Sequence, residues 1–313
     1  MPPDNLFIFD ENSSMNLSGK AWQWMILIIL AFIWGSSFIL MKKGLISFDN
    51  NQVASFRLFF SFLFFIPFII PRIRKINRHN IRSLLIVGII GNGLPAFLFT
   101  KAQTQIDSSI AGILNSLTPL SALIIGLIFY KSGVKIINIL GVLLGFIGAF
   151  GLIYQGSPTG GQDQNNWYAL FVVVATICYG ISVNEVKHKL EDLDGLSIAA
   201  LSFLFTGPLG GLYLLFSDLG SSFSNPYALQ SLGFVMILAV FGSFLAMILF
   251  NILIKYTTAI FGASVTYIIP IFAVFWGLFD GEKLSLDQFF WIIVILIGVY
   301  LVNKKKLIEI SAP

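Results

Sequence analysis

The sequence contains two similar halves, and both are almost wholly apolar. An offset of 145 residues, the first repeat offset, aligns the beginnings of the copies at the pairs Trp22/Trp167, Trp34/Tyr179, Gly35/Gly180 and Ser37/Ser182. An offset of 151 residues, the second repeat offset, aligns the later parts at the pairs Gly91/Gly242, Pro119/Pro270 and Gly126/Gly277. A duplicated apolar chain is typical of transporters, because many of them place the substrate path between two repeats.

Composition shows which solvent surrounds the chain. Hydrophobic residues make up 57% and charged residues 11% of the sequence, whereas a soluble domain carries about 25% charged residues. So few charges cannot cover a surface that faces water, so we expect lipid to surround the protein. The net charge of +4 is spread over short loops and does not indicate a nucleic-acid partner. Cys178 is the single cysteine, which excludes an intrachain disulfide and a cysteine-rich metal site.

Ten apolar stretches have the length that a bilayer requires, roughly 17–25 residues per helix. They cover residues 22–41, 52–70, 83–100, 107–129, 134–154, 167–186, 197–216, 230–250, 258–279 and 287–303. The first stretch follows Lys20 and is longer than the apolar part of a signal peptide, so we interpret it as an uncleaved span. Translation could start at Met1 or at Met15, since nothing before Met15 has a structural pattern.

A polar linker divides the chain into two halves. The segment 155–166 is rich in Gly, Gln and Asn and has no apolar stretch, which is typical of a flexible connection. We therefore predict a polar N-terminal segment at 1–20, a five-helix repeat at 21–154, the linker, a second five-helix repeat at 167–303 and a basic tail at 304–313. Because five is an odd number, the two repeats must have opposite orientations in the membrane. The predicted fold is an all-α membrane protein of ten transmembrane helices, built as two inverted five-helix repeats.

The placement of lysine and arginine predicts the orientation. With ten spans, fourteen of the 19 basic residues fall in loops on the side of the N-terminus, four fall on the other side, and Arg57 lies within a span. Cytoplasmic loops of membrane proteins are enriched in Lys and Arg. Both termini are therefore expected in the cytoplasm and the linker outside, in a plasma membrane, or the inner membrane in a prokaryote.

Short motifs in this order resemble the EamA-type transporters of the drug/metabolite transporter superfamily. They are Trp34-Gly35-Ser36-Ser37-Phe38 followed by Lys42, Ala54-Ser55-Phe56-Arg57, the prolines Pro119 and Pro270, and Gly281-Glu282-Lys283-Leu284. The resemblance covers residues 20–305. It implies export or exchange of small metabolites through a central cavity lined by helices 1, 3, 4, 6, 8 and 9. The family often has an acidic residue after helix 4 as well as after helix 9, but Lys131 stands at the position aligned with Glu282.

Polar and aromatic residues within spans are the candidates for substrate binding, because such residues usually face the protein interior. Two symmetric pairs lie on helices 1 and 6, namely Trp34 with Tyr179 and Ser37 with Ser182. Each could line the cavity or could only pack between helices. Asn92 lies in Gly91-Asn92-Gly93-Leu94-Pro95, which indicates either a broken helix at the site or close helix packing.

Helices 4 and 9 supply further candidates beside their prolines. Asn115 and Thr118 lie one turn apart, and Thr266 and Tyr267 lie in the corresponding region of the second repeat. They could contact a ligand or could form hydrogen bonds between helices. Arg57 is the deepest charge. It could anchor an anionic substrate group, bond to backbone carbonyls or reach toward the outer interface. Glu185, by contrast, lies near a span end and is expected to be solvated or paired.

The motifs that are missing exclude other classes of protein. The sequence has no pair of mid-span aspartates, no His-Glu-x-x-His, no Gly-x-Ser-x-Gly and no Walker A motif. We therefore expect no enzyme, no ATP-driven pump, no metal and no cofactor. The predicted function is secondary transport of a small neutral or zwitterionic metabolite, such as an amino acid, by alternating access. A sugar-phosphate or nucleotide-sugar exchanger is the alternative, and a non-transporting membrane scaffold is a further one.

Small-residue faces favour close helix packing. Gly141-x-x-x-Gly145 and Gly207-x-x-x-Gly211 could join two copies of the chain as a homodimer or could pack helices within one chain. The expected partners are thus membrane lipid, a small-molecule substrate and, by the first interpretation, a second copy.

Overall fold

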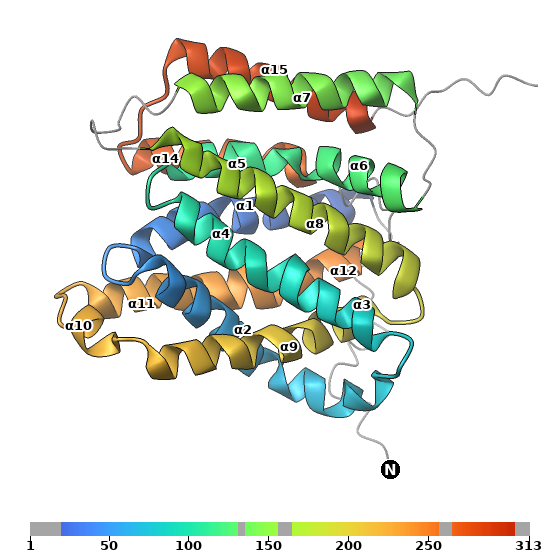
Figure 1. Cartoon of the computed structure of the whole chain (residues 1–313), viewed down its shortest axis with the longest axis vertical. Coiled ribbons are helices and arrows are strands. Elements are labelled where there is room, and N and C mark those ends of the chain that lie inside the picture. The colour runs from blue at the N-terminus through green and yellow to red at the C-terminus, as the bar shows by residue number, and fades with distance from the viewer. Residues whose placement is uncertain (1–19, 131–134, 156–164, 257–264, 304–313) are drawn as a thin grey trace, which may run out of the picture.

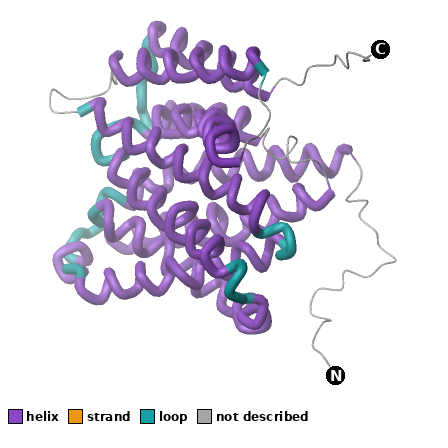
Figure 2. Tube along the Cα trace, turned by 45° about the vertical axis from the view of Figure 1, so that its right-hand side comes forward, coloured by secondary structure: helices purple, strands orange, loops and turns teal. Residues whose placement is uncertain are grey.

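The computed structural model describes residues 20–130, 135–155, 165–256 and 265–303, and all regular structure in them is helical (Figure 2). The α-helices are α1 (Lys20–Gly44), α2 (Asn50–Arg72), α3 (Ile81–Leu85), α4 (Leu94–Ala102), α5 (Ser108–Leu114), α6 (Thr118–Tyr130), α7 (Ile136–Gln155), α8 (Ala169–Lys189), α9 (Gly195–Phe216), α10 (Leu219–Phe223), α11 (Ala228–Ile237), α12 (Ala246–Tyr256), α14 (Val265–Phe279) and α15 (Leu286–Asn303). Short 3₁₀ helices are η1 (Ile73–Lys75), η3 (Asn115–Leu117) and η4 (Asn166–Tyr168), and two π-helices are η2 (Ile86–Gly93) and η5 (Leu238–Leu245). The all-helical prediction is confirmed for this part of the chain.

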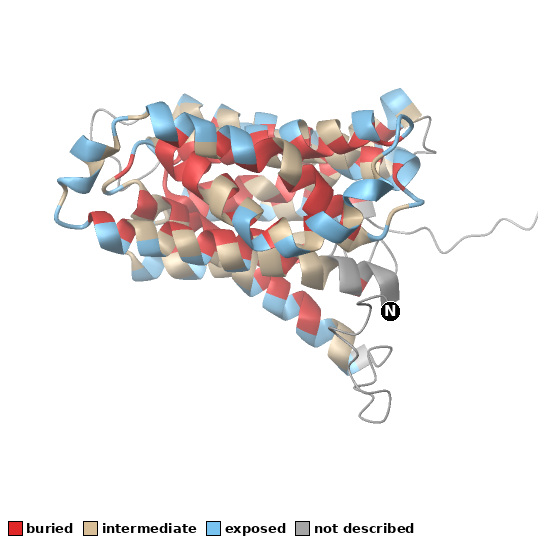
Figure 3. Cartoon of the chain, turned by 90° about the horizontal axis from the view of Figure 1, so that it is seen from below, coloured by how far each residue is buried: buried red, intermediate tan, exposed pale blue. Residues whose placement is uncertain are grey.

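Eight helical segments in the described residues are long and apolar enough to cross a membrane, and α14 and α15 are shorter apolar helices. The predicted N-terminal segment, the basic tail, most of the linker and the first residues of the predicted span 258–279 lie outside the described residues. Buried residues run through the middle of the bundle (Figure 3). Many large apolar side chains are exposed on its helices. Phe216, for example, is 84% exposed. Such a surface requires lipid, which agrees with the multi-pass membrane protein expected from composition.

The long helices run side by side in stacked layers (Figure 1). Helices α7 and α15 form one edge, α2 and α9 form the opposite edge, and α1, α4, α5, α6, α8 and α14 lie between them. Both edge pairs join one helix from each half of the chain. Within the layers, α1 packs against α14 as α8 packs against α6. The packing of these helices therefore follows the repeat found in the sequence.

The two helices at the α2–α9 edge begin in the same way. Asp49 caps α2 by accepting a hydrogen bond from the backbone N–H of Gln52, and Asp194 caps α9 by accepting one from Ser197, each over 2.9 Å. A side-chain oxygen at this position satisfies an amide that has no partner within the helix. The first repeat offset relates Asp49 to Asp194, so it also locates the two helix starts.

Glycines let helices approach within the chain. A Cβ added to Gly298 on α15 would lie 2.5 Å from the backbone nitrogen of Gly145 and 2.6 Å from the carbonyl oxygen of Gly141, both on α7. On α9, Gly207 and Gly211 pack in the same way against Phe62 and Phe59 of α2. Both predicted small-residue faces are therefore covered by helices of the same chain. A homodimer would need another surface.

Candidate functional site

The first candidate region lies where α1 meets the π-helix η5. Trp34 donates a hydrogen bond from its indole nitrogen to the carbonyl oxygen of Gly242, over 3.1 Å. Ser37 packs on the same glycine, because a Cβ added to Gly242 would lie 2.8 Å from the Ser37 hydroxyl oxygen. A π-helix contains a turn that is one residue wider than an α-turn, which disturbs the regular hydrogen bonds and leaves carbonyls that can bond elsewhere. The Trp34 side chain makes such a bond.

The equivalent contact lies between α8 of the second half and η2 of the first half. Ser182 packs on Gly91, where an added Cβ would lie 2.2 Å from the serine hydroxyl oxygen. Tyr179, the counterpart of Trp34, stacks on Phe99 of α4 with ring centroids 6.0 Å apart. Glycine is required at both π-helices because a larger side chain would displace the serine of the facing helix. The two predicted Ser and aromatic pairs thus occupy related places in the bundle.

A polar contact joins the edge helices to the π-helices, and it occurs twice. Arg57 on α2 donates from Nε to the hydroxyl oxygen of Ser243 on η5, over 3.1 Å. Asn92 on η2 donates from Nδ2 to the hydroxyl oxygen of Ser202 on α9, over 3.0 Å. The first repeat offset relates Arg57 to Ser202, and the second relates Asn92 to Ser243. The contacts are therefore equivalent, but only one of them carries a charge.

Arg57 reaches further than its counterpart. One terminal nitrogen lies 3.9 Å from the sulfur of Met41 on α1. The side chain therefore reaches both α1 and η5. Among the described residues, the hydrogen bonds of the Arg57 side chain go to a hydroxyl oxygen and a sulfur.

The candidates in the predicted spans 107–129 and 258–279 are more dispersed. The 3₁₀ helix η3 interrupts the span between α5 and α6, and Thr118 donates to the carbonyl oxygen of Asn115 over 2.8 Å. Tyr267 donates its hydroxyl hydrogen to the carbonyl oxygen of Val299 on α15, over 2.9 Å, which directs that hydroxyl toward the edge of the bundle. Thr266 is half-buried near the start of α14. The structure does not bring the Tyr267 hydroxyl together with the groups around Arg57.

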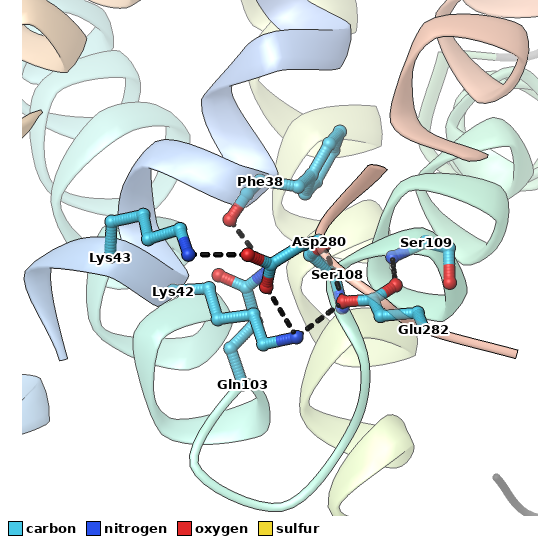
Figure 4. Close-up of polar contacts among 8 residues, drawn as sticks. All are labelled: Phe38, Lys42, Lys43, Gln103, Ser108, Ser109, Asp280 and Glu282. Atoms are coloured by element: carbon cyan, nitrogen blue, oxygen red, sulfur yellow. Dashed lines mark hydrogen bonds and ion pairs between the residues drawn. The ribbon is translucent and has the colours of Figure 1, made fainter. Parts of the chain in front are cut away.

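A buried carboxylate joins three elements at one end of the bundle (Figure 4). Glu282 accepts hydrogen bonds from the backbone N–H and hydroxyl of Ser108, over 2.8 and 2.7 Å, and from the backbone N–H of Ser109, over 3.0 Å. Lys42 at the end of α1 pairs with the same carboxylate over 2.8 Å. Asp280 pairs with Lys42 over 3.0 Å and also with Lys43. We call these six residues the lysine cluster.

Local chain geometry positions Glu282. Helix α14 ends at a turn in which Gly281 has a φ of 87°, a conformation that side chains disfavour. Gly277 leaves room for the carboxylate, since an added Cβ would lie 2.3 Å from its Oε2 atom. The carboxylate therefore reaches the first turn of α5, where unsatisfied N–H groups favour negative charge. Although burial alone raises the pKa of Glu282, the hydrogen bonds from Lys42, Ser109 and Ser108 hold it below its ordinary value.

The opposite end of the bundle has a second buried carboxylate. Glu185 on α8 accepts a hydrogen bond from the hydroxyl of Ser83 on α3, over 2.7 Å, and another from the hydroxyl of Tyr130 at the end of α6. The imidazole ring of His188 stacks on the Tyr130 ring with centroids 4.7 Å apart. We call these four residues the tyrosine cluster. Glu185 is thus a paired and buried group, which was one of the two states expected for it.

A surface cavity opens at the same end as the lysine cluster. It has a volume of about 330 Å³ and is lined by Asn50, Asn51, Phe97, Leu98, Lys101 and Phe171. Its wall on α4 adjoins Phe99, the ring on which Tyr179 stacks. Among the described residues no group of three His, Cys, Asp or Glu side chains could hold a metal ion.

Sequence reasoning missed several members of these contacts. Ser202 and Ser243 could have been found, because the repeat offsets align them with the two candidates Arg57 and Asn92. Glu282 belonged to a recognised motif, but its partners in α1 and α5 are distant in sequence. Nothing in the sequence pattern indicated that Ser83, Tyr130 and Glu185 meet.

The fold is that of a multi-pass membrane protein whose two halves pack alike. The chain belongs to the EamA-like transporter family, which matches residues 22–154 and 166–304. The family and the relatives named below are membrane transporters and not enzymes, so the protein is a membrane transporter.

Three curated relatives span almost the whole chain. The inner membrane transporter YedA of Escherichia coli strain K12 is 27% identical over 297 residues, covering 92% of each protein. A transporter of Archaeoglobus fulgidus is 21% identical over 287 residues, covering 91% of this chain and 99% of its own. An S-adenosylmethionine/S-adenosylhomocysteine transporter of Chlamydia muridarum is 22% identical over 296 residues, covering 90% of this chain and 91% of its own.

The fold also has a counterpart among solved crystal structures. One such chain superposes with a TM-score of 0.61 at 13% sequence identity, covering 90% of this chain and 96% of its own. At this identity the likeness shows the fold alone.

Proposed function

We propose that the protein is a secondary transporter that moves a small metabolite by alternating access, along a path between two inverted five-helix repeats. The observation that carries the proposal is the repeated polar contact of Arg57 with Ser243 and of Asn92 with Ser202. Both contacts adjoin π-helices within spans. Polar groups within spans are costly, so they usually mark a functional site, and π-helices are frequent at such sites. Trp34, Ser37, Tyr179 and Ser182 line the same region in this proposal, and Asn115, Thr118 and Thr266 complete it.

The ends of the bundle support a path that opens on alternate sides. The lysine cluster joins α1, α5 and the segment after α14, and the tyrosine cluster joins α3, α6 and α8. In alternating access one end separates while the other stays closed. The distribution of basic residues supports an orientation with both termini in the cytoplasm, so the lysine cluster lies outside.

A reporter that is active only outside the membrane tests this orientation. We expect it to be silent when fused after Pro313 and active when inserted near Thr159. Activity at Pro313 and silence at Thr159 would reverse the orientation and contradict the assignment of the two ends.

The substrate class follows from the charges in the bundle. A doubly charged phosphate favours two or more basic groups, whereas Arg57 is the basic residue at the repeated contact and faces neutral groups. A neutral or zwitterionic metabolite, such as an amino acid, fits this site better than a sugar phosphate or nucleotide sugar. The Chlamydia muridarum relative is named for two compounds that each contain an amino-acid group, which supports the same class.

Counterflow in proteoliposomes tests the function. Vesicles loaded with an unlabelled amino-acid mixture should accumulate the labelled mixture without ATP, and vesicles without protein should not. Exchange of phosphorylated sugars alone would favour the sugar-phosphate alternative. Failure to move any member of a broad metabolite set would favour the non-transporting scaffold.

Cysteine labelling tests the location of the path. After Cys178 is replaced, cysteines at Asn92, Asn115 and Tyr179 should react with a small polar thiol reagent, and substrate should slow the reaction. If all three positions are inert in the folded protein, the path lies elsewhere.

A further inference from the structure

The most unusual charge in the molecule is the guanidinium of Arg57. It is the eighth residue of α2, so its backbone lies about 10 Å along the helix from its first residue. From there the side chain extends to Ser243 on η5 and to Met41 on α1. The charge therefore lies within reach of two other helical elements.

Arg57 has no negatively charged partner among the described residues. The four ion pairs found there all involve lysine, at Lys42, Lys43 and Lys75. The acceptors around Arg57 are a hydroxyl oxygen and a thioether sulfur, and the sulfur is a weak acceptor. A guanidinium has five N–H donors, and the contacts with Ser243 and Met41 use two of its three nitrogens. An anion at this position would accept hydrogen bonds from donors that have no acceptor among the described residues.

The neighbours of the guanidinium do not close it off. Arg57 is only half-buried by accessible surface, although its side chain contacts Ser243 on η5 and Met41 on α1. A small ligand that reached the accessible part of this side chain would contact the guanidinium directly.

The equivalent position in the other repeat shows that the fold does not require an arginine here. Ser202 occupies it on α9 and completes the same contact to a π-helix, through Asn92, without any charge. The same packing is thus formed by a short neutral side chain. The arginine adds length, donors and charge to one half of the site only.

We propose that Arg57 binds the carboxylate of the transported metabolite, through two parallel N–H···O hydrogen bonds. This inference rests on the proposed transport function and narrows its substrate class to compounds with one carboxylate. A planar guanidinium matches a carboxylate in this geometry. One positive charge balances one carboxylate, whereas a phosphate dianion would remain half-neutralised. The site would be asymmetric, with the carboxylate held on the α2 side of the path.

The test uses the purified full-length protein and matched compounds. Each amino acid of a set is compared with its amide, which keeps the shape and lacks the negative charge, by stabilisation against thermal unfolding. The acids should stabilise the natural protein, and the amides should bind about 10- to 100-fold more weakly. Arg57→Gln should lose this preference, and Arg57→Lys should keep part of it. Arg72→Gln, the same change at the end of the same helix, should leave it intact.

Several results would overturn the inference. Equal stabilisation by acids and amides, an unchanged preference in a folded Arg57→Gln protein, or no stabilisation by any acid would each do so. Stronger stabilisation by phosphorylated compounds that depends on Arg57 would replace the carboxylate by a phosphate. Counterflow of uncharged compounds through the same preparation would leave the transport function standing while removing the role of Arg57, so the two failures can be distinguished.

Discussion

The two ends of the bundle are both joined by a buried carboxylate, but the two carboxylates have different partners. At each end a buried carboxylate joins three helical elements. In the lysine cluster Glu282 is paired with a lysine and also accepts three hydrogen bonds from the start of α5. In the tyrosine cluster Glu185 accepts its hydrogen bonds from the neutral hydroxyls of Ser83 and Tyr130. Separating the helices at the first end would break an ion pair, and at the second only neutral hydrogen bonds, which are weaker.

The carboxylates do not occupy equivalent positions in the repeat. The second repeat offset relates Glu282 to Lys131, which lies outside the described residues, and the first relates Glu185 to Leu40. The repeat therefore does not extend to the carboxylates that join the helices at each end. Under the proposed cycle, the two ends would then have different resistance to opening.

The largest effect is expected for Glu282→Gln. The change removes the negative charge that Lys42 and the α5 amides face, and it should lower the free energy of unfolding by about 1–3 kcal/mol. Thermal unfolding of the purified protein measures the loss. An unfolding temperature equal to that of the natural protein would show that the lysine cluster contributes nothing to stability.

Acidification should reduce the same contribution. The pKa of Glu282 is lower in the folded protein than its ordinary value of 4.5, so its charged form stabilises the fold. This stability is complete above pH 4.5 and is lost as the pH falls through the lowered folded value. The difference in unfolding temperature between the natural protein and Glu282→Gln should therefore be constant near neutral pH and shrink below pH 4.5. A difference that grows on acidification would contradict the sign.

A smaller effect is expected for Glu185→Gln. The glutamine oxygen can still accept one of the two hydrogen bonds from Ser83 and Tyr130, so about 1 kcal/mol should be lost. The comparison between the two ends is tested directly by measuring this variant beside Glu282→Gln. A greater loss for Glu185→Gln would reverse the order of the two clusters.

Tyr130→Phe should have the smallest effect. It removes one hydroxyl and keeps the ring that stacks on His188, so a loss of about 0.5–1 kcal/mol is expected. Unfolding of this variant and of the double variant with Glu185→Gln measures whether the two groups act together. Additive losses would show that the bond between them contributes little.

Much of the fold can be predicted from the sequence because membrane spans and repeats leave strong patterns. The described helices follow the predicted apolar stretches, and α2 and α9 begin at aspartates that the first repeat offset relates. The direction of individual side chains cannot be predicted in this way. In a membrane, the face that meets lipid and the face that meets protein are both apolar, so periodicity does not identify the inner face. That is why the contact of Tyr267 with α15, the pairing of Asn92 with Ser202 and the burial of Glu185 appear only in the structure.

The candidate site depends on pairs of residues that are distant in sequence. The repeat offsets relate Arg57 to Ser202 and Asn92 to Ser243, yet they do not say that these two pairs touch in a crossed manner between helices. Only the packing of α2 on η5 and of α9 on η2 joins them. The charge of Arg57 was visible in the sequence, and its lack of a negative partner among the described residues was not.

The positions of the two π-helices suggest how the repeat arose. Helix η2 covers Ile86–Gly93 and η5 covers Leu238–Leu245, so a shift of 152 residues superimposes their first and last residues, one residue more than the second repeat offset. A π-turn arises when one residue is inserted into an α-helix. The simplest origin of two insertions at nearly matching places is a single insertion in an ancestral gene that encoded one half of this chain. By this account the widened turn is older than the duplication, and a relative built from one such unit would carry the same extra residue.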